Sequence, residues 1–206
     1  MNVNIDIQAA QRGELIVNTT KVEGHQSTRL LIGTHTDSSA RVKKAYPFFV
    51  VGKNAETYPE LIDRIIDDGH EIGNHTYSHP CVNKQSQAAF REELTRCEEI
   101  IQRVVGVHPK LFRPPQGSWN TRVYEIARER DYSVILWDLD TLDWAHTPSE
   151  NISNYILENV KSGNIILMHD FIGHNSKTPE ALEKIIPVLI SRGYEFVTVS
   201  ELLGVR

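Results

Sequence analysis

The fold of this chain is indicated most clearly by residues 47–80, "PFFVVGKNAETYPELIDRIIDDGHEIGNHTYSHP". The stretch opens with an apolar run that predicts a buried strand over 46–51. Residues 57–68 then have the apolar spacing of an amphipathic helix, which ends at Gly69 as helix C-caps prefer. A second short strand is expected at 71–74. A strand, a helix and a strand in this order predict a parallel β/α unit.

The same alternation continues toward the C-terminus. Further strands are expected at 111–113, 133–138, 164–168 and 195–199, and helices at 85–105, 120–130, 149–161 and 177–192. Runs that are apolar on both faces, such as "SVILWD" and "NIILMHD", favour a sheet or barrel that helices cover. The sequence shows no linker, repeat or low-complexity segment. We therefore expect an α/β fold in a single domain over residues 1–206.

Composition narrows the possible partners. The chain is 40% apolar and 24% charged, as in ordinary soluble proteins, and its net charge of −5 comes without blocks of like charge, which argues against nucleic acid. No apolar run approaches the roughly 20 residues that span a bilayer, and no signal-peptide pattern is visible. The two cysteines, Cys81 and Cys97, are too few for a disulfide framework. Cys97 falls in a helical pattern and is expected to be a small core residue.

Reactive residue types gather at or just after the ends of the expected strands. His75 and His79 follow the strand at 71–74, and His169 follows the one at 164–168. The stretches "FRPPQG" and "WDLDTLDW" stand at the corresponding places after two other strands. The carboxyl ends of parallel strands form one rim, where active sites are built. The sequence therefore predicts that these four polar clusters converge in one site.

The histidine pair allows more than one interpretation. His75 and His79 are spaced i, i+4, which puts two imidazoles on one face of a helical turn and lets them share a metal ion. An isolated pair of this kind is more often a pair of surface or capping histidines. The neighbouring His70-Glu71 suggests the zinc-protease motif H-E-x-x-H, but Asn74 stands where that motif has its second histidine. Gly73, in a β-like run, also argues against the long helix that the motif needs.

Over residues 46–203 the chain resembles the carbohydrate esterase family 4 polysaccharide deacetylases, also called the NodB homology domain. Four motifs carry the resemblance, in the family's order: "HTYSH", "RPPQG", "DTLDW" and "LMH". The first is similar to H-[ST]-x-x-H, with Thr76 at the small hydroxyl position, and the second to R-x-P-Y-G. The resemblance implies a distorted (β/α) barrel of the polysaccharide deacetylase (NodB homology) type, and we expect it to be a monomer.

The resemblance also implies roles for the polar residues. His75 and His79 would be ligands of zinc or another divalent transition metal. His169 would be the general acid that protonates the leaving amine, and Asp143 would hold the His169 ring and stabilise its imidazolium. Arg113 matches the family's arginine, whose partner is the general base.

Three further residues match the family's substrate contacts. Gln116 replaces the usual tyrosine of the "RPPQG" motif, and its backbone N–H would help stabilise the tetrahedral oxyanion. Trp144 and Leu167 would form a small apolar slot for the acetyl methyl group. Taken singly, four of the matched residues are at least as often structural as functional. In that case Trp144 and Leu167 would be core residues, Arg113 would form a surface ion pair and His169 would cap a strand.

The implied function is metal-dependent removal of N-acetyl groups from an N-acetylglucosamine-containing polysaccharide such as peptidoglycan or chitin. The alternative is a catalytically impaired carbohydrate-binding pseudoenzyme that keeps the fold. Because the family's polymeric substrates lie in the cell wall or outside the cell, an extracellular or wall-associated protein is expected, although no signal peptide is visible in this chain.

Residues 1–45 depart from the family, whose first motif is T-F-D-D-G. The first aspartate of that motif is the general base and the second is the third metal ligand. One possible register puts Thr36 and Asp37 at these two positions, and another puts Val22 and Glu23 there. Asp37 is preferred as the third ligand, because the apolar run before it predicts a buried strand. His35 would share a face with Asp37 and is the second choice.

Neither register supplies both acids, and the expected loss of catalytic rate can be estimated. A positioned general base contributes about 10²–10⁴-fold in rate. A shifted reading frame or altered start in the gene and a degenerate domain both stay open as explanations. Translating the DNA upstream of codon 46 in the other two frames would separate them, since a T-F-D-D-G peptide would identify a frame error.

Overall fold

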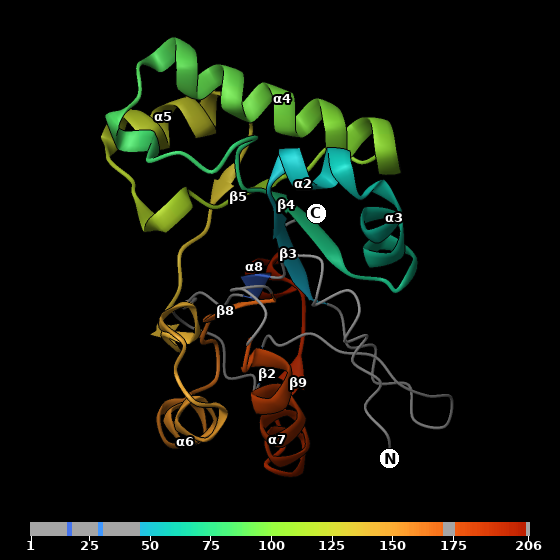
Figure 1. Ribbon diagram of the computed structural model, residues 1–206, viewed down its shortest axis with the longest axis vertical. Helices are drawn as coiled ribbons and strands as arrows, with labels where there is room; N and C mark the ends of the chain where they lie inside the picture. Colours follow the sequence, from blue (N-terminus) through green and yellow to red (C-terminus); the bar gives the residue numbers. More distant parts are fainter. Residues whose placement is uncertain (1–15, 18–28, 31–45, 171–175, 205–206) are drawn as a thin grey trace. The chain divides into compact units, whose positions relative to one another are not determined.

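The computed structural model describes residues 16–17, 29–30, 46–170 and 176–204 (Figure 1). The contacts divide the chain into two compact units. The first, residues 48–67 and 72–136, is called here the His75 unit, and the rest of the chain is called the His169 unit. The expectation of a single domain stays a prediction. The candidate third ligands Asp37, His35 and Glu23 lie outside the described residues.

Strands and helices alternate in the His75 unit, as predicted. Its sheet has the order β3 (Pro47–Val50), β4 (Glu71–Asn74), β5 (Leu111–Phe112), β6 (Ser133–Val134). The β4–β5 and β5–β6 pairs are parallel, with Asn74 opposite Phe112 and Leu111 opposite Ser133. The helices are α2 (Gly52–Thr57), α3 (Pro59–Asp67), α4 (Gln87–Val105) and α5 (Thr121–Glu129), with short turns η1 (Val82–Lys84) and η2 (Pro115–Gly117).

The helix predicted at 57–68 is α3, Pro59–Asp67, and the separate helix α2 before it was not predicted. Tyr58 lies between them with φ −130° and ψ 62°. A proline disfavours the helical conformation of the residue before it, and Pro59 then begins α3, as prolines at the first helical position often do. The helix α2 starts at Gly52, where a Cβ atom would lie 2.9 Å from the Cα atom of Cys97 in α4. Cys97 is completely buried, which confirms it as a small core residue.

Gly73 in β4 allows close packing against Phe49 and Leu111. A Cβ atom at this position would lie 2.5 Å from both Cδ1 and Cε1 of the Phe49 ring and 3.2 Å from Cβ of Leu111. Phe49 is fully buried, and the Arg113 guanidinium lies 4.1 Å from its ring centroid. The ring is therefore enclosed by the core, and a Cβ atom at position 73 would clash with it.

We expect Gly73→Ala to lower the free energy of unfolding by about 1–3 kcal/mol, the usual cost of overpacking a core. Urea unfolding followed by circular dichroism measures this loss. The cost should shrink in a Phe49→Leu background, because the clashing atoms belong to the Phe49 ring. An equal cost in both backgrounds would show that the Phe49 contact is not the cause.

Two smaller sheets form the His169 unit. One has the order β1 (Ile16–Val17), β8 (Ile166–His169), β7 (Leu139–Asp140), with β1 antiparallel and β7 parallel to β8. The other pairs β2 (Arg29–Leu30) in parallel with β9 (Glu195–Phe196). The helices α6 (Ser149–Asn159) and α7 (Thr178–Ser191) pack together, and α8 (Val199–Leu203) and the turn η3 (Asp143–Ala145) complete the unit. Among the described residues, none of the helices combines the length and apolarity needed to cross a membrane.

Two predicted strands end several residues earlier than expected. The strand predicted at 133–138 ends at Val134, and the one predicted at 195–199 ends at Phe196. The second ends early because a capping box starts α8: the Thr198 hydroxyl accepts from the Glu201 N–H, and the Glu201 carboxylate accepts from the Thr198 N–H. The sequence "TVSE" carries this capping signal, which outweighs the strand propensity of its valine and threonine.

Glu71 has a structural role in the His169 unit. Glu71 is the first residue of β4, but its contacts place it in the His169 unit. Because residues 71–74 form a strand, the helix that an H-E-x-x-H motif needs is not present there. The Glu71 carboxylate accepts a hydrogen bond from the Ser200 N–H at 3.2 Å and another from the Ser200 hydroxyl. Burial raises the pKa of Glu71 above its ordinary value, while the Ser200 hydrogen bonds lower it without offsetting the burial.

This raised pKa predicts how stability depends on pH. Because folded Glu71 holds its proton more tightly than unfolded Glu71, the free energy of unfolding should fall as the pH rises from about 4.3 through the raised pKa. The side chain at this position would not ionise in Glu71→Gln, so the free energy of unfolding of this variant should rise relative to that of the wild type as the pH increases across that window. Above the window the difference should level off. Urea unfolding of both proteins between about pH 4 and pH 7 measures the difference. A constant difference, or one that shrinks as the pH rises, would contradict the assignment.

Candidate active site

His75 directly follows β4 and is buried, with 3% of its surface exposed. Its Nδ1 atom lies 2.8 Å from the backbone oxygen of Arg113. Since a carbonyl oxygen only accepts, Nδ1 carries the proton in this contact. The neutral ring then has its lone pair on Nε2. An imidazole whose other nitrogen donates to a carbonyl is the usual form of a metal-ligating histidine.

His79 is exposed and lies beside His75. The two ring centroids are 4.9 Å apart and the ring planes meet at 66°. Two imidazoles bound to one tetrahedral zinc ion have centroids about 5 Å apart, so both rings fit a shared ion. Within the part of the chain that the structure describes, no group of three or more His, Cys, Asp and Glu side chains could hold a metal. The structure therefore brings two predicted ligands together, and the candidates for the third lie outside the described residues.

The loop that carries the pair has a strained backbone. Thr76 and His79 have φ values of 68° and 59°, in the left-handed region that β-branched and bulky residues rarely adopt. Local hydrogen bonds hold them there: the Thr76 N–H donates to the Asn74 side-chain oxygen at 2.8 Å, and the His79 N–H donates to the Thr76 hydroxyl at 3.1 Å. Backbone strain of this kind persists only where the surroundings impose it, and it concentrates at functional sites.

Asn74 organises this loop and was not predicted as a site residue. It is completely buried, and its amide nitrogen donates to the backbone oxygen of Leu94 and to the Tyr132 hydroxyl, both at 2.9 Å. Burial raises the pKa of Tyr132 above its ordinary value, which keeps this hydroxyl protonated. One sequence signal could have identified Asn74: a polar residue that ends a buried strand needs partners for all its polar atoms.

Arg113 lies just after β5 with 1% of its surface exposed, so it does not form an ion pair on the surface, as a purely structural role would have suggested. Its guanidinium stacks over the Phe49 ring, and Nη2 donates to the backbone oxygen of Leu136 at 3.4 Å. Burial lowers the pKa of the Arg113 guanidinium below its ordinary value. Gln116 follows in η2 with an exposed side chain and a φ of 59°.

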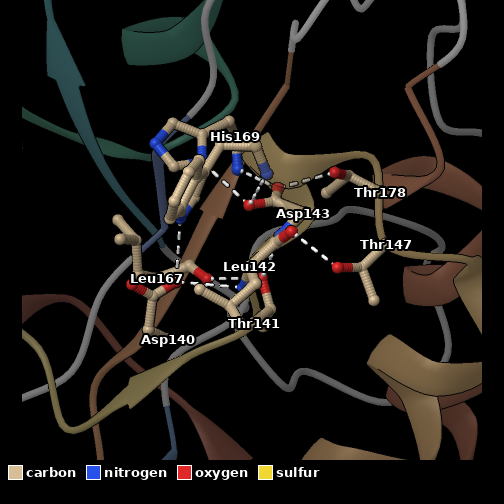
Figure 2. A network of polar contacts seen from close by, with 9 residues as sticks. Asp140, Thr141, Leu142, Asp143, Thr147, Leu167, His169 and Thr178 are labelled. Carbon is tan, nitrogen blue, oxygen red and sulfur yellow. Dashed lines mark hydrogen bonds and ion pairs between the residues drawn. The ribbon is translucent and has the colours of Figure 1, made fainter.

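Asp143 and His169 form a closed polar network in the His169 unit (Figure 2). The Asp143 carboxylate is completely buried, and its Oδ1 atom lies 2.8 Å from Nδ1 of His169. Oδ1 also accepts from the Trp144 N–H at 2.9 Å, and Oδ2 accepts from the His169 N–H at 2.5 Å. Two backbone N–H groups can only donate, so the network fits the ionised carboxylate. His169 therefore donates through Nδ1, and its Nε2 atom is the position for proton transfer.

The two predicted apolar contacts differ in exposure. Trp144 is 52% exposed, and its ring nitrogen donates to Asp140 at 3.2 Å, so it is not a core residue. Leu167 lies on β8 with 5% of its surface exposed, and its backbone oxygen accepts from the Thr141 hydroxyl at 2.9 Å. Thr141 and a second buried threonine, Thr178, were not predicted as site residues. Thr178 stands 35 positions from Asp143, its hydrogen-bond partner, and no sequence pattern connects the two.

The chain is similar to proteins of one family. A family model described as Polysaccharide deacetylase matches residues 41–135. Two peptidoglycan-N-acetylglucosamine deacetylases of Bacillus cereus are 40% and 38% identical to the chain, over 73% and 81% of its length. The chain spans about half of the first relative (55%) and 79% of the second.

Solved structures agree. The Bc1960 peptidoglycan N-acetylglucosamine deacetylase, in complex with 4-naphthalen-1-yl-N-oxidanyl-benzamide, matches 92% of each chain with a TM-score of 0.81 and 30% identity. A CE4 family pseudoenzyme from Bacillus anthracis matches 76% of this chain and 54% of its own, with a TM-score of 0.71 and 29% identity. These similarities confirm the predicted fold class, an α/β fold of the distorted (β/α) barrel type.

Proposed function

Because the chain belongs to the polysaccharide deacetylase family, we propose that it hydrolyses N-acetyl groups of an N-acetylglucosamine-containing polysaccharide of the peptidoglycan or chitin type. The observation that carries the proposal is the contact between the buried Asp143 carboxylate and Nδ1 of His169. The contact fixes the orientation of the His169 ring and engages Nδ1, which makes Nε2 the nitrogen for proton transfer. The names of the Bacillus cereus relatives favour peptidoglycan over chitin.

We assign the metal site to the His75 unit. His75 and His79 would hold zinc or another divalent transition metal, with Asp37 as the proposed third ligand and His35 or Glu23 as alternatives. The tautomer of His75 and the spacing of the two rings support this assignment. A bound divalent ion would polarise the amide carbonyl and acidify a water molecule, the two tasks that an unactivated amide most needs.

His169 would protonate the leaving amine through Nε2. The Asp143 carboxylate would accept the Nδ1–H proton of His169 in a hydrogen bond. Its charge would stabilise the imidazolium and keep the ring in position. The amine leaves as the sugar amino group, and acetate is the second product.

The remaining family positions would orient the substrate. We assign the oxyanion contact to the Gln116 N–H, since a backbone donor survives the change from tyrosine to glutamine at this position. Trp144 and Leu167 would contact the acetyl methyl group. Arg113 matches the arginine that pairs with the general base in the family, and in this chain the position of that base falls on Thr36 or Val22.

A second candidate is a catalytically impaired protein that still binds glycans. Two observations favour it: the sequence contains no Asp-Asp pair before residue 60, and a CE4 neighbour is described as a pseudoenzyme. Loss of a positioned general base alone would reduce the rate by about 10²–10⁴-fold.

Acetate release and glycan binding together separate the two candidates. The zinc-reconstituted protein is incubated with tetra-N-acetylchitotetraose and, separately, with N-acetylated peptidoglycan, while calorimetry measures binding of the same oligosaccharide. Deacetylation predicts acetate in proportion to protein and time. Binding without acetate release from either substrate favours the pseudoenzyme. The absence of both binding and acetate release would contradict both candidates.

We also propose that the protein is a monomer that acts in the cell wall or outside the cell, because the substrates of the relatives are wall glycans. Fractionation of the native cells with an antibody tests the location, and light scattering tests the mass. A product found in the cytosol alone would count against a wall glycan as substrate.

A further inference from the structure

We propose that Thr178 is a positioning residue for His169, acting through the Asp143 carboxylate. The Thr178 hydroxyl lies 2.8 Å from Oδ2 of Asp143, while Nδ1 of His169 lies 2.8 Å from Oδ1 of the same carboxylate (Figure 2). The inference rests on the proposed role of His169 as general acid. It concerns the orientation of the ring, which can be observed without turnover.

The direction of the Thr178 hydrogen bond follows from its surroundings. Oδ1 accepts from the Trp144 N–H and Oδ2 from the His169 N–H, and neither backbone group can accept a proton. The carboxylate is therefore an acceptor on both oxygens. With Nδ1–H of His169 and the Thr178 hydroxyl, four donors match the roughly four lone-pair sites of an ionised carboxylate.

Thr178 holds the carboxylate from a different element than the other donors. Trp144 belongs to η3 and His169 to β8, whereas Thr178 is the first residue of α7. A hydrogen bond from a third element restrains rotation of the carboxylate about its Cβ–Cγ bond. Because the His169 ring is aligned by one oxygen of that carboxylate, the restraint passes to the ring.

The hydroxyl is not used to cap its own helix. The N-cap residue of α7 is Lys177, which makes no side-chain capping bond, and the Thr178 hydroxyl points to Asp143 instead. Only 1% of the Thr178 surface is exposed, so bulk water has no direct access to replace a lost hydroxyl. The hydrogen bond between Thr178 and Asp143 is therefore shielded from bulk water, as expected of a contact that fixes the orientation of a side chain.

The test follows the Nδ1–H proton of His169 by low-temperature NMR, with His169→Gln identifying the signal. In the wild type we expect a low-field Nδ1–H resonance in slow exchange with water and a nitrogen-15 shift typical of a protonated Nδ1. Thr178→Val keeps the shape but removes the donor, and should speed exchange of this proton about tenfold or broaden it beyond detection. Thr178→Ser keeps the donor and should retain the signal.

Two controls make the result specific. Thr147→Val removes a hydroxyl of the same network that donates to the Leu142 backbone oxygen at 2.7 Å and not to Asp143, so the signal should be unchanged. If Thr178→Val does not fold, Thr178→Cys takes its place, because a thiol of serine-like shape is only a weak donor. The comparison is then made between Thr178→Ser and Thr178→Cys.

The positioning role would be overturned if Thr178→Val or Thr178→Cys kept the wild-type signal, or if Thr147→Val weakened it equally. Acetate release by the same variants is a second readout: a lower kcat in Thr178→Val with an unchanged KM, restored in Thr178→Ser, is expected. A wild-type protein that releases no acetate but shows the NMR pattern would sink the proposed function and leave this inference standing.

Discussion

Replacing both His75 and His79 with alanine is expected to remove the divalent metal and, with it, acetate release. The two rings lie 4.9 Å apart, and His75 is held with its Nε2 atom as the unprotonated nitrogen of the neutral ring. Loss of both imidazoles should weaken zinc binding by more than about 100-fold, the upper end of what loss of a supporting contact alone costs. Equilibrium dialysis with zinc analysis measures the change.

Single variants separate ligation from folding. His79 is exposed, so His79→Ala should lose metal with little change in the free energy of unfolding. His75 is buried and donates to the Arg113 oxygen, so His75→Ala should also cost about 1–3 kcal/mol of stability. The matched control is the double variant His108→Ala/His146→Ala, which removes two exposed histidines elsewhere and should keep the metal.

The same assay addresses the third ligand. If Asp37 completes the site, Asp37→Asn should weaken zinc binding in the same direction as His79→Ala, while Glu23→Gln should not. If the double variant at His75 and His79 holds zinc as tightly as the wild type, the proposed metal site does not exist.

Asp143→Asn is expected to lower acetate release by about 10²–10⁴-fold, the contribution of a positioned general acid. Each carboxylate oxygen of Asp143 accepts from a backbone N–H, Oδ1 from Trp144 and Oδ2 from His169. An asparagine has only one acceptor oxygen, so its NH₂ group must face one of these N–H donors. The variant therefore loses the alignment of the His169 ring.

The same mismatch predicts a loss of stability. A buried donor left without an acceptor costs about 1–3 kcal/mol, which urea unfolding of Asp143→Asn should detect. Asp138→Asn is the matched control, since the Asp138 carboxylate accepts from the Ile165 N–H at 2.7 Å and an asparagine oxygen can replace it. Wild-type kinetics in Asp143→Asn, or equal losses in both variants, would contradict the role assigned to Asp143.

The fold was largely predictable because its signals are local. The strand at 71–74 and the long helices follow from apolar periodicity and from glycines at their ends. The errors occurred where one residue outweighs the pattern around it. Pro59 starts α3 later than the helix predicted from residue 57, and the capping box of Thr198 ends a strand that β-branched residues favour.

The site was predictable only in part. Motif order and strand ends pointed to His75, His79, Asp143 and His169 as site residues, and the structure places the members of each pair side by side. Thr178 could not be predicted, because its contact with Asp143 depends on where α7 begins. Asp37 lies outside the described residues and stays a prediction.

The central claim is that this chain removes acetyl groups with His169 as general acid. Mass spectrometry of tetra-N-acetylchitotetraose and of peptidoglycan fragments, each incubated with the zinc-loaded wild type or with His169→Gln, tests it most directly. We predict that at least one of the substrates loses acetyl groups in the presence of the wild type and that this loss falls by about 10²-fold or more with His169→Gln. Both glycans recovered fully acetylated, or equal deacetylation by both proteins, would contradict the claim.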